Sequence, residues 1–179
     1  MTPVGHLAVS WLTARPLPVK ARFWLVAGGL LPDVDFALVL MPGFNDLHRN
    51  ATHSLAFAAL LGLLAAVVSR RARWMAGAAV LFGALLHIQI DAVLDSNPSN
   101  GIGVALFWPF SAWMYSPFNL LSAGCPGWDR PLVALACTGP MLLWELPFWL
   151  LAGFLFVRSR RIDPAPIPSG DRKRPLNSG

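Results

Sequence analysis

The sequence predicts an all-α integral membrane protein, a helical bundle with a short N-terminal helical hairpin and about three spanning helices. Its 179 residues suit one domain. The composition is 55% hydrophobic and only 13% charged, with a mean hydropathy of +0.54, which is more apolar than an ordinary soluble domain. The placement of the basic residues supports the same fold class.

Basic residues mark the predicted cytoplasmic side. Twelve of the 14 lysines and arginines fall into four clusters, at residues 15–22, 70–73, 158–161 and 172–174. Each of the first three clusters adjoins an apolar segment, as cytoplasmic loops do under the positive-inside rule. The formal charge of +5 therefore reports membrane orientation, and nucleic acid is not expected as a partner.

Two short apolar helices are predicted at residues 4–14 and 21–31. Pro16 and Pro18 lie between them, and two prolines there cannot continue a helix. At 1.5 Å per residue each helix is about 15 Å long, too short to cross a hydrocarbon core of about 30 Å. We expect a hairpin that enters from the cytoplasmic side, with its basic turn at the surface.

This hairpin has a chemical consequence, because it brings His6 and the Asp33/Asp35 pair to the same end, away from the basic turn. In an alternative arrangement, residues 23–41 form one membrane helix interrupted by Pro-Asp-Val-Asp. Such a broken helix is tolerated where it lines a cavity.

The clearest spanning helices are predicted at residues 53–68 and 74–95, joined by the basic turn at 70–73. Asn50 or Thr52 is expected to cap the first of them. Because the shared turn faces the cytoplasm, the far ends of both helices face outward. The polar residues at those ends should therefore share one depth, in the outer half of the membrane.

The remaining chain completes the domain organisation. Residues 132–157 are the last predicted crossing, and the membrane-embedded domain spans residues 1–161. Residues 162–179 form a basic tail rich in proline and serine, expected to be disordered in the cytoplasm. The loop at 98–130 is rich in glycine, proline and aromatic residues, and either sits at the membrane–water interface or simply packs.

Histidine and aspartate are concentrated in one otherwise apolar stretch, which contains three of the four histidines. Polar groups of these types in apolar surroundings point to a metal site. His87 and Asp91 are four residues apart on a predicted helix, so they share a face. Imidazole and carboxylate ligands suit Zn²⁺, with Mn²⁺ as the alternative. The predicted metal ligands are His6, Asp33, His48, His53, His87 and Asp91.

Other interpretations of this cluster remain open. His87 and Asp91 can form a hydrogen-bonded polar core without metal, or a proton relay. If metal is bound, His6 together with Asp35 or His48 can complete a second position.

Three residues are predicted to act in catalysis. Arg49 is the only cation near these acids, and it can hold a substrate phosphate in a bidentate fork or, alternatively, reach lipid headgroups. Asp35 lies beside the predicted ligands. Asp95 is close to a helix end, where it orients a ligand or caps the loop that starts at Ser96.

These residues resemble a known family. The matching pieces are Gly5-His6, Leu31-Pro32-Asp33-Val34-Asp35, His48-Arg49, Thr52-His53-Ser54, residues 87–91, and Gly101-Ile102 leading to residues 107–110. Over about residues 1–120 the sequence is similar to the bacterial inner-membrane YdjM-like family, described as membrane-bound metal-dependent hydrolases. The resemblance implies a multi-pass inner-membrane protein with a metal-dependent hydrolase site; under the positive-inside rule its C-terminus is cytoplasmic.

A fainter similarity is to the zinc-dependent phospholipase C and P1-type nuclease superfamily. That all-helical fold holds its metals with an N-terminal His, an Asp, a later His and a His-x-x-x-Asp helix. His6, Asp33, His53 (or His48) and His87 with Asp91 occur here in that order. No histidine follows Asp91, so a site with one or two ions is the most that this similarity implies.

The predicted function is hydrolysis of a phosphoester by metal-activated water. A site at the outer rim, with membrane lipids as partners, favours a lipid or lipid-linked substrate. One alternative is a non-enzymatic membrane protein in which the cluster is a structural metal or polar core. Another is an ion or proton transporter, which the absence of an internal repeat disfavours.

Overall fold

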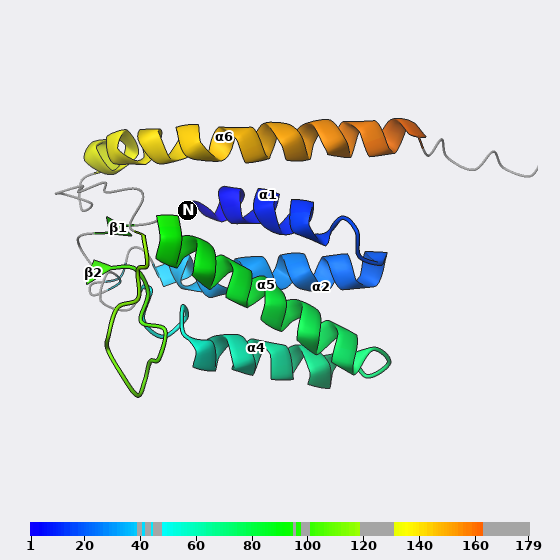
Figure 1. The fold of residues 1–179 in the computed structure, drawn as a ribbon, viewed down its shortest axis with the longest axis horizontal. Coiled ribbons are helices and arrows are strands. Elements are labelled where there is room, and N and C mark those ends of the chain that lie inside the picture. Colours follow the sequence, from blue (N-terminus) through cyan, green and yellow to red (C-terminus); the bar gives the residue numbers. More distant parts are fainter. Residues whose placement is uncertain are drawn as a thin grey trace, which may run out of the picture.

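The computed structural model describes residues 1–38, 41, 44, 48–94, 96–97, 101–118 and 131–162. Within these ranges the fold is all-helical, as predicted, apart from one antiparallel pair of two-residue strands (Figure 1). The elements in chain order are α1 (Pro3–Ala14), α2 (Val19–Leu30), the 3-10 helix η1 (Leu31–Leu38), α4 (Leu55–Val68), α5 (Arg73–Leu94), β1 (Ser96–Asn97), β2 (Gly101–Ile102) and α6 (Pro131–Ile162).

The N-terminal hairpin is confirmed by α1 and α2, which pack against each other and turn at the prolines. Thr2 caps α1, since its side chain accepts a hydrogen bond from the backbone N–H of Gly5. After α2 the chain continues without a gap into η1, so the Pro-Asp-Val-Asp stretch forms a 3-10 helix and does not interrupt a longer one. This tighter helix buries Asp33 and Asp35 together while Val34 between them stays 55% exposed.

The start of α4 corrects two expectations. The cap is Ser54 and not Asn50 or Thr52, because the Ser54 hydroxyl accepts a hydrogen bond from the backbone N–H of Phe57 at 3.1 Å. His53 therefore precedes the helix instead of opening it. At 14 residues α4 is also about 21 Å long, shorter than a hydrocarbon core of about 30 Å.

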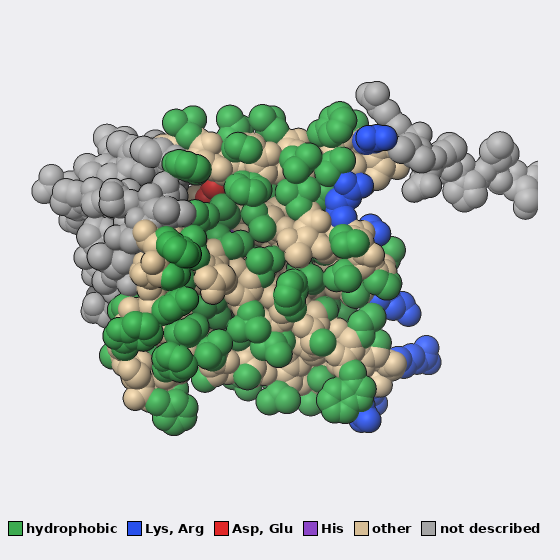
Figure 2. Space-filling model, in the orientation of Figure 1, with side chains coloured by type: hydrophobic (Ala, Val, Ile, Leu, Met, Phe, Trp, Pro, Cys, Tyr) green, Lys and Arg blue, Asp and Glu red, His purple; other side chains and the backbone are tan. Residues whose placement is uncertain are grey.

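Two helices in the described ranges have the length and composition to cross a membrane, namely α5 and residues Leu142–Arg160 of α6. Only 6% of the α6 segment is buried within the protein, and most of its large apolar side chains are exposed. Figure 2 shows a largely apolar surface with Lys and Arg gathered at one end of it. The basic turns thus lie together, as the positive-inside rule requires for one side of a membrane.

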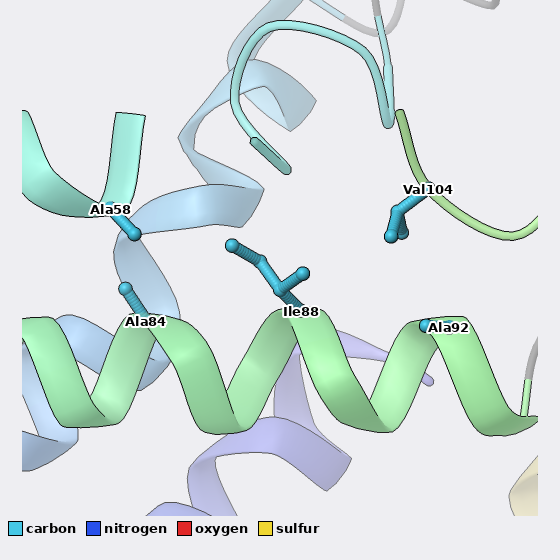
Figure 3. Packing of buried hydrophobic residues seen from close by; sticks show 5 residues of the cluster. All are labelled: Ala58, Ala84, Ile88, Ala92 and Val104. Carbon is cyan, nitrogen blue, oxygen red and sulfur yellow. The ribbon is translucent and has the colours of Figure 1, made fainter. Parts of the chain in front are cut away.

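The central helix α5 has two buried faces. Ala84, Ile88 and Ala92 recur every four residues and pack against Ala58 of α4 and Val104 (Figure 3). The residues one position earlier along α5, at 83, 87 and 91, face α1, α2 and η1 instead. Small residues on the first face let the helices approach closely, and the second face is left for the polar residues of the site.

Glycines set the distance between α2 and α5. A Cβ added at Gly83 would lie 2.2 Å from the carbonyl oxygen of Leu25, and one at Gly28 would lie 2.2 Å from that of Val80. Any side chain at either position would force the helices apart. This close contact brings the last turn of α2 next to the polar face of α5.

Candidate metal centre

Four predicted ligands meet in the interior, at the end of the bundle away from the basic turns. Asp33 comes from η1, His53 from the segment before α4, and His87 and Asp91 from the end of α5. Each is at most 7% exposed. One donor atom from each lies within 4.8 Å of the others, so the group can hold a metal ion. We call these four residues the acceptor centre.

The ring of His87 is oriented by the backbone. Its Nδ1 lies 2.8 Å from the carbonyl oxygen of Gly29. Because a carbonyl only accepts hydrogen bonds, Nδ1 carries the proton and Nε2 keeps its lone pair. The close packing of α2 on α5 supplies this carbonyl, so the backbone directs the lone pair of His87 into the centre.

The ring of His53 is oriented by a side-chain relay. Its Nδ1 lies 3.0 Å from the hydroxyl oxygen of Thr52, and that hydroxyl donates to Asp35 Oδ2 at 2.9 Å. Since the Thr52 proton is used on the carboxylate, the hydroxyl oxygen accepts from His53 Nδ1–H. His53 Nε2 therefore also keeps its lone pair, and it lies 3.2 Å from His87 Nε2.

The acceptor centre is thus four acceptors facing one another. The Nε2 atoms of His53 and His87 lie 3.6 and 3.5 Å from Asp33 Oδ1, and 3.3 and 3.5 Å from Asp91 Oδ2. In a tetrahedral zinc site with bonds of 2.0–2.1 Å, neighbouring ligand atoms are about 3.3 Å apart. The residues present therefore fit a metal ion, and lone pairs packed this closely need a cation or added protons between them.

A second group contains Asp35, His48 and His53, whose donor atoms also lie within 4.8 Å of one another. Here the contacts are ordinary hydrogen bonds. His48 Nδ1 lies 3.0 Å from Asp35 Oδ2, the same oxygen that accepts from Thr52. We call Asp35, His48 and Thr52 the relay, because hydrogen bonds connect them to the outer nitrogen of His53.

His6 lies beside the acceptor centre and outside both groups. Its Nε2 is 3.0 Å from Asp91 Oδ1, the oxygen that faces away from His53 and His87. The amino group of Met1 is 2.7 Å from the same oxygen. The ring of His6 also stacks on His87 with 3.6 Å between ring centroids. His6 is therefore placed to orient Asp91.

Arg49 is 4% exposed and lies near the carboxylates of both groups. Its backbone has φ 69°, a left-handed conformation that a non-glycine residue adopts at a cost of about 1–3 kcal/mol. The backbone N–H of Ala105 holds it there by donating to the Arg49 carbonyl oxygen at 2.9 Å. Burial lowers the pKa of Arg49, against the opposing effect of Asp91, Asp33 and Asp35, yet a guanidinium stays charged at neutral pH.

Burial also affects the neighbouring ionisable groups. It lowers the pKa of His6 to about 4, although Asp91 opposes the shift, so His6 is neutral at pH 7. It likewise lowers the pKa of His48 despite the hydrogen bond to Asp35. The imidazoles of His6 and His48, which adjoin the acceptor centre and the relay, are therefore neutral at pH 7.

The structure brings together all the predicted site residues that it describes. Asp95 lies outside the described residues. The sequence analysis assigned Thr52 to a helix cap and did not predict its place in the relay. It also did not predict that the Gly29 carbonyl orients His87. Nor was a role assigned to Glu145, a buried carboxylate of α6 that accepts hydrogen bonds from the backbone N–H and the hydroxyl of Thr2. A hydroxyl directly before a candidate His ligand was the available signal for Thr52.

The structure is an all-helical bundle with an exposed apolar helix, basic turns at one end and a buried His/Asp centre at the other. These features define an integral membrane protein of the helical-bundle class, with a group of residues that can hold a metal ion. The chain belongs to the YdjM inner membrane protein family, whose model matches residues 1–162. It is similar to the inner membrane protein YbcI of Escherichia coli strain K12, with 29% identity over 179 residues that cover 89% of this chain and 99% of YbcI.

No solved structure matches this chain. The family and the relative confirm the predicted bacterial inner membrane location. The fainter similarity to zinc-dependent phospholipase C and P1-type nucleases is not shown by these matches and stays a prediction.

Proposed function

We propose that this protein is a membrane-embedded metal-dependent hydrolase that acts on a phosphoester. One observation carries the proposal: the Nε2 lone pairs of His53 and His87 and the carboxylates of Asp33 and Asp91 face one another at the spacing of a tetrahedral metal site. We propose a single ion, Zn²⁺ or alternatively Mn²⁺, because the ligands are imidazole and carboxylate.

Such an ion lowers the pKa of a coordinated water and polarises a phosphoryl oxygen. The protein's own residues supply the remaining functions. Asp35 Oδ1 is buried and has no hydrogen-bond partner in the described part of the chain, so it can accept a proton. Arg49 is held beside these carboxylates by its backbone and can neutralise charge on a phosphate.

The proposed substrate is a lipid or lipid-linked phosphoester. The acceptor centre lies near the C-terminal end of α5, and Arg73 lies at the other end of this helix. The end with the basic residues is cytoplasmic by the positive-inside rule. We therefore place the site on the outer side of the membrane and the C-terminus in the cytoplasm. The loop that follows α5 carries exposed aromatic side chains, including Phe110 at 92% and Trp113 at 58% exposure, as expected of a segment seated among headgroups.

A structural metal is the second candidate, and the number of protein ligands favours it. Structural zinc sites use four protein ligands, whereas catalytic sites usually keep one position for water. Two observations weigh against it. Cysteine, the usual structural ligand, is not among the four residues. A strained, buried Arg49 is also not needed to hold a metal.

The decisive experiment compares turnover with bound metal. Purified protein loaded with Zn²⁺ or Mn²⁺ should hydrolyse phospholipid or polyprenyl-phosphate analogues. Arg49→Gln should lower turnover by about 10²- to 10³-fold and leave metal content unchanged, because the residue acts on the developing charge. If metal-loaded wild-type protein turns over none of these phosphoesters while metal removal lowers its melting temperature, the structural role is correct instead.

A further inference from the structure

A groove lies between α1 and α6, on the opposite face of α1 from the acceptor centre. It has a volume of about 350 Å³, within the range of about 300–1,000 Å³ typical of small-molecule sites. The lining residues are apolar or aromatic: Val4, Leu7, Ala8, Trp11, Trp149, Ala152, Gly153 and Phe156. Val4, Leu7, Ala8 and Trp11 follow the spacing of one helix face, whereas His6 points away from them toward Asp91.

The groove opens to the surface that faces lipid. Val4 is 56% exposed, Leu7 42% and Phe156 44%, and the α6 segment beside them is barely covered by the rest of the protein. An apolar groove in that position is in contact with hydrocarbon chains. Its occupant is then a lipid chain, and what distinguishes one lipid from another is the headgroup.

Two guanidinium groups stand at the basic end of this groove. The Arg15 guanidinium carbon lies 5.5 Å from the ring centroid of Trp11, and that of Arg160 lies 4.7 Å from the ring centroid of Phe156. The two rings also meet edge to face, 6.2 Å apart. The two guanidinium groups therefore stack on aromatic side chains that line the groove. They lie toward the end of the protein where the basic residues gather (Figure 2).

We infer that this groove binds one anionic phospholipid of the cytoplasmic leaflet. One acyl chain lies between α1 and α6, and the phosphate lies against Arg15 and Arg160. Charge complementarity selects the occupant, since basic pockets between membrane helices on the cytoplasmic side bind anionic headgroups. This lipid site is separate from the proposed hydrolase centre and does not depend on it. The bound lipid also helps to attach α6, because this helix contacts the bundle mainly through α1.

Gly153 offers a way to fill the groove without disturbing the protein. It lines the groove, yet a Cβ added there meets no described atom within 4 Å. Gly139, on the same helix but not among the lining residues, has the same property and serves as the matched control. For the charges, Arg73 is the control, because it stacks on Trp74 at 5.1 Å and neither residue lines the groove.

The test is native mass spectrometry of the full chain in detergent with added phosphatidylglycerol or phosphatidylethanolamine. We expect one phosphatidylglycerol retained per chain, preferred by roughly 30-fold, because each of two basic residues near an anionic lipid contributes about fivefold. Arg15→Gln/Arg160→Gln should remove this preference, whereas Arg71→Gln/Arg73→Gln, with the same loss of charge, should keep it.

Gly153→Leu should abolish retention of either lipid, and Gly139→Leu should behave as wild type. Melting temperatures measured on the same samples show whether each variant is folded. Equal retention of the two lipids, a preference that survives Arg15→Gln/Arg160→Gln, or a second copy of the chain occupying the groove in place of lipid would each overturn the inference.

Discussion

Two neighbouring clusters of histidine and aspartate meet at His53, and the spacing of their polar atoms differs. In the relay, His48 Nδ1 and the Thr52 hydroxyl lie 3.0 and 2.9 Å from Asp35 Oδ2, and each contact has a donor and an acceptor. In the acceptor centre the spacings are 3.2–3.6 Å, and the protons of both imidazoles are used elsewhere. The same residue types thus form a satisfied hydrogen-bond network in one cluster and a set of unmatched acceptors in the other.

The comparison shows that residue type alone does not distinguish a ligand from the residue that orients it. The distinction lies in where each imidazole proton goes. His87 gives its Nδ1 proton to Gly29 and His53 gives its own to Thr52, so only their Nε2 atoms can bind a cation. We therefore expect changes in the acceptor centre to affect metal binding more than changes in the relay.

The largest effect is expected for Asp91→Asn. This change replaces a carboxylate that faces both imidazoles through Oδ2 and His6 through Oδ1. Metal affinity, measured by competition with a chelator, should fall by more than about 100-fold, beyond the 10- to 100-fold typical of outer-shell changes. Unchanged affinity in a folded Asp91→Asn protein would remove Asp91 from the centre.

Thr52→Val should have the next largest effect. The variant keeps the shape of the side chain but removes the hydroxyl that accepts from His53 Nδ1 and donates to Asp35. Metal affinity should fall by about 10- to 100-fold, as for other residues that orient a ligand. Thr52→Ser is the control, because it retains the hydroxyl, and it should bind metal nearly as well as wild type.

A smaller effect is expected for His48→Gln. This side chain lies one hydrogen bond further from the centre, on Asp35 Oδ2. Because one hydrogen bond contributes about 0.5–1.5 kcal/mol, affinity should change by about tenfold or less. A loss as large as that of Asp91→Asn would show that His48 is itself a ligand and that the relay holds a second ion.

Ser54→Ala should leave metal binding almost unaffected. Ser54 caps α4 but takes no part in either cluster. Loss of the cap should lower the free energy of unfolding by about 1 kcal/mol. Denaturation in detergent, followed by circular dichroism, measures this change, and a large loss of metal would show that the cap also positions His53.

Much of this organisation could be predicted from local pattern. The prolines defined the turn between α1 and α2, and the four-residue spacing placed His87 and Asp91 on one face of α5. The antiparallel path of the hairpin correctly placed His6 and Asp33 at the same end of the bundle, where both interact with Asp91. These inferences needed only helix geometry and the positions of charged residues.

The remaining features depend on contacts that are distant in sequence. The cap at Ser54 follows from Thr52 being engaged by Asp35, 17 residues away, which no local pattern shows. The orientation of His87 follows from a backbone carbonyl of α2, 58 residues away, brought close by glycines on both helices. Proton positions set by such contacts could not be inferred before the packing was known.

The most direct measurement is the metal content of the purified protein by mass spectrometry, wild type beside a His87→Ala/Asp91→Ala double variant. We expect about one transition-metal ion per wild-type chain and none in the double variant, since four protein ligands match one tetrahedral ion. A folded wild-type protein that takes up neither Zn²⁺ nor Mn²⁺ would contradict it, and shared protons would then hold the four acceptors together.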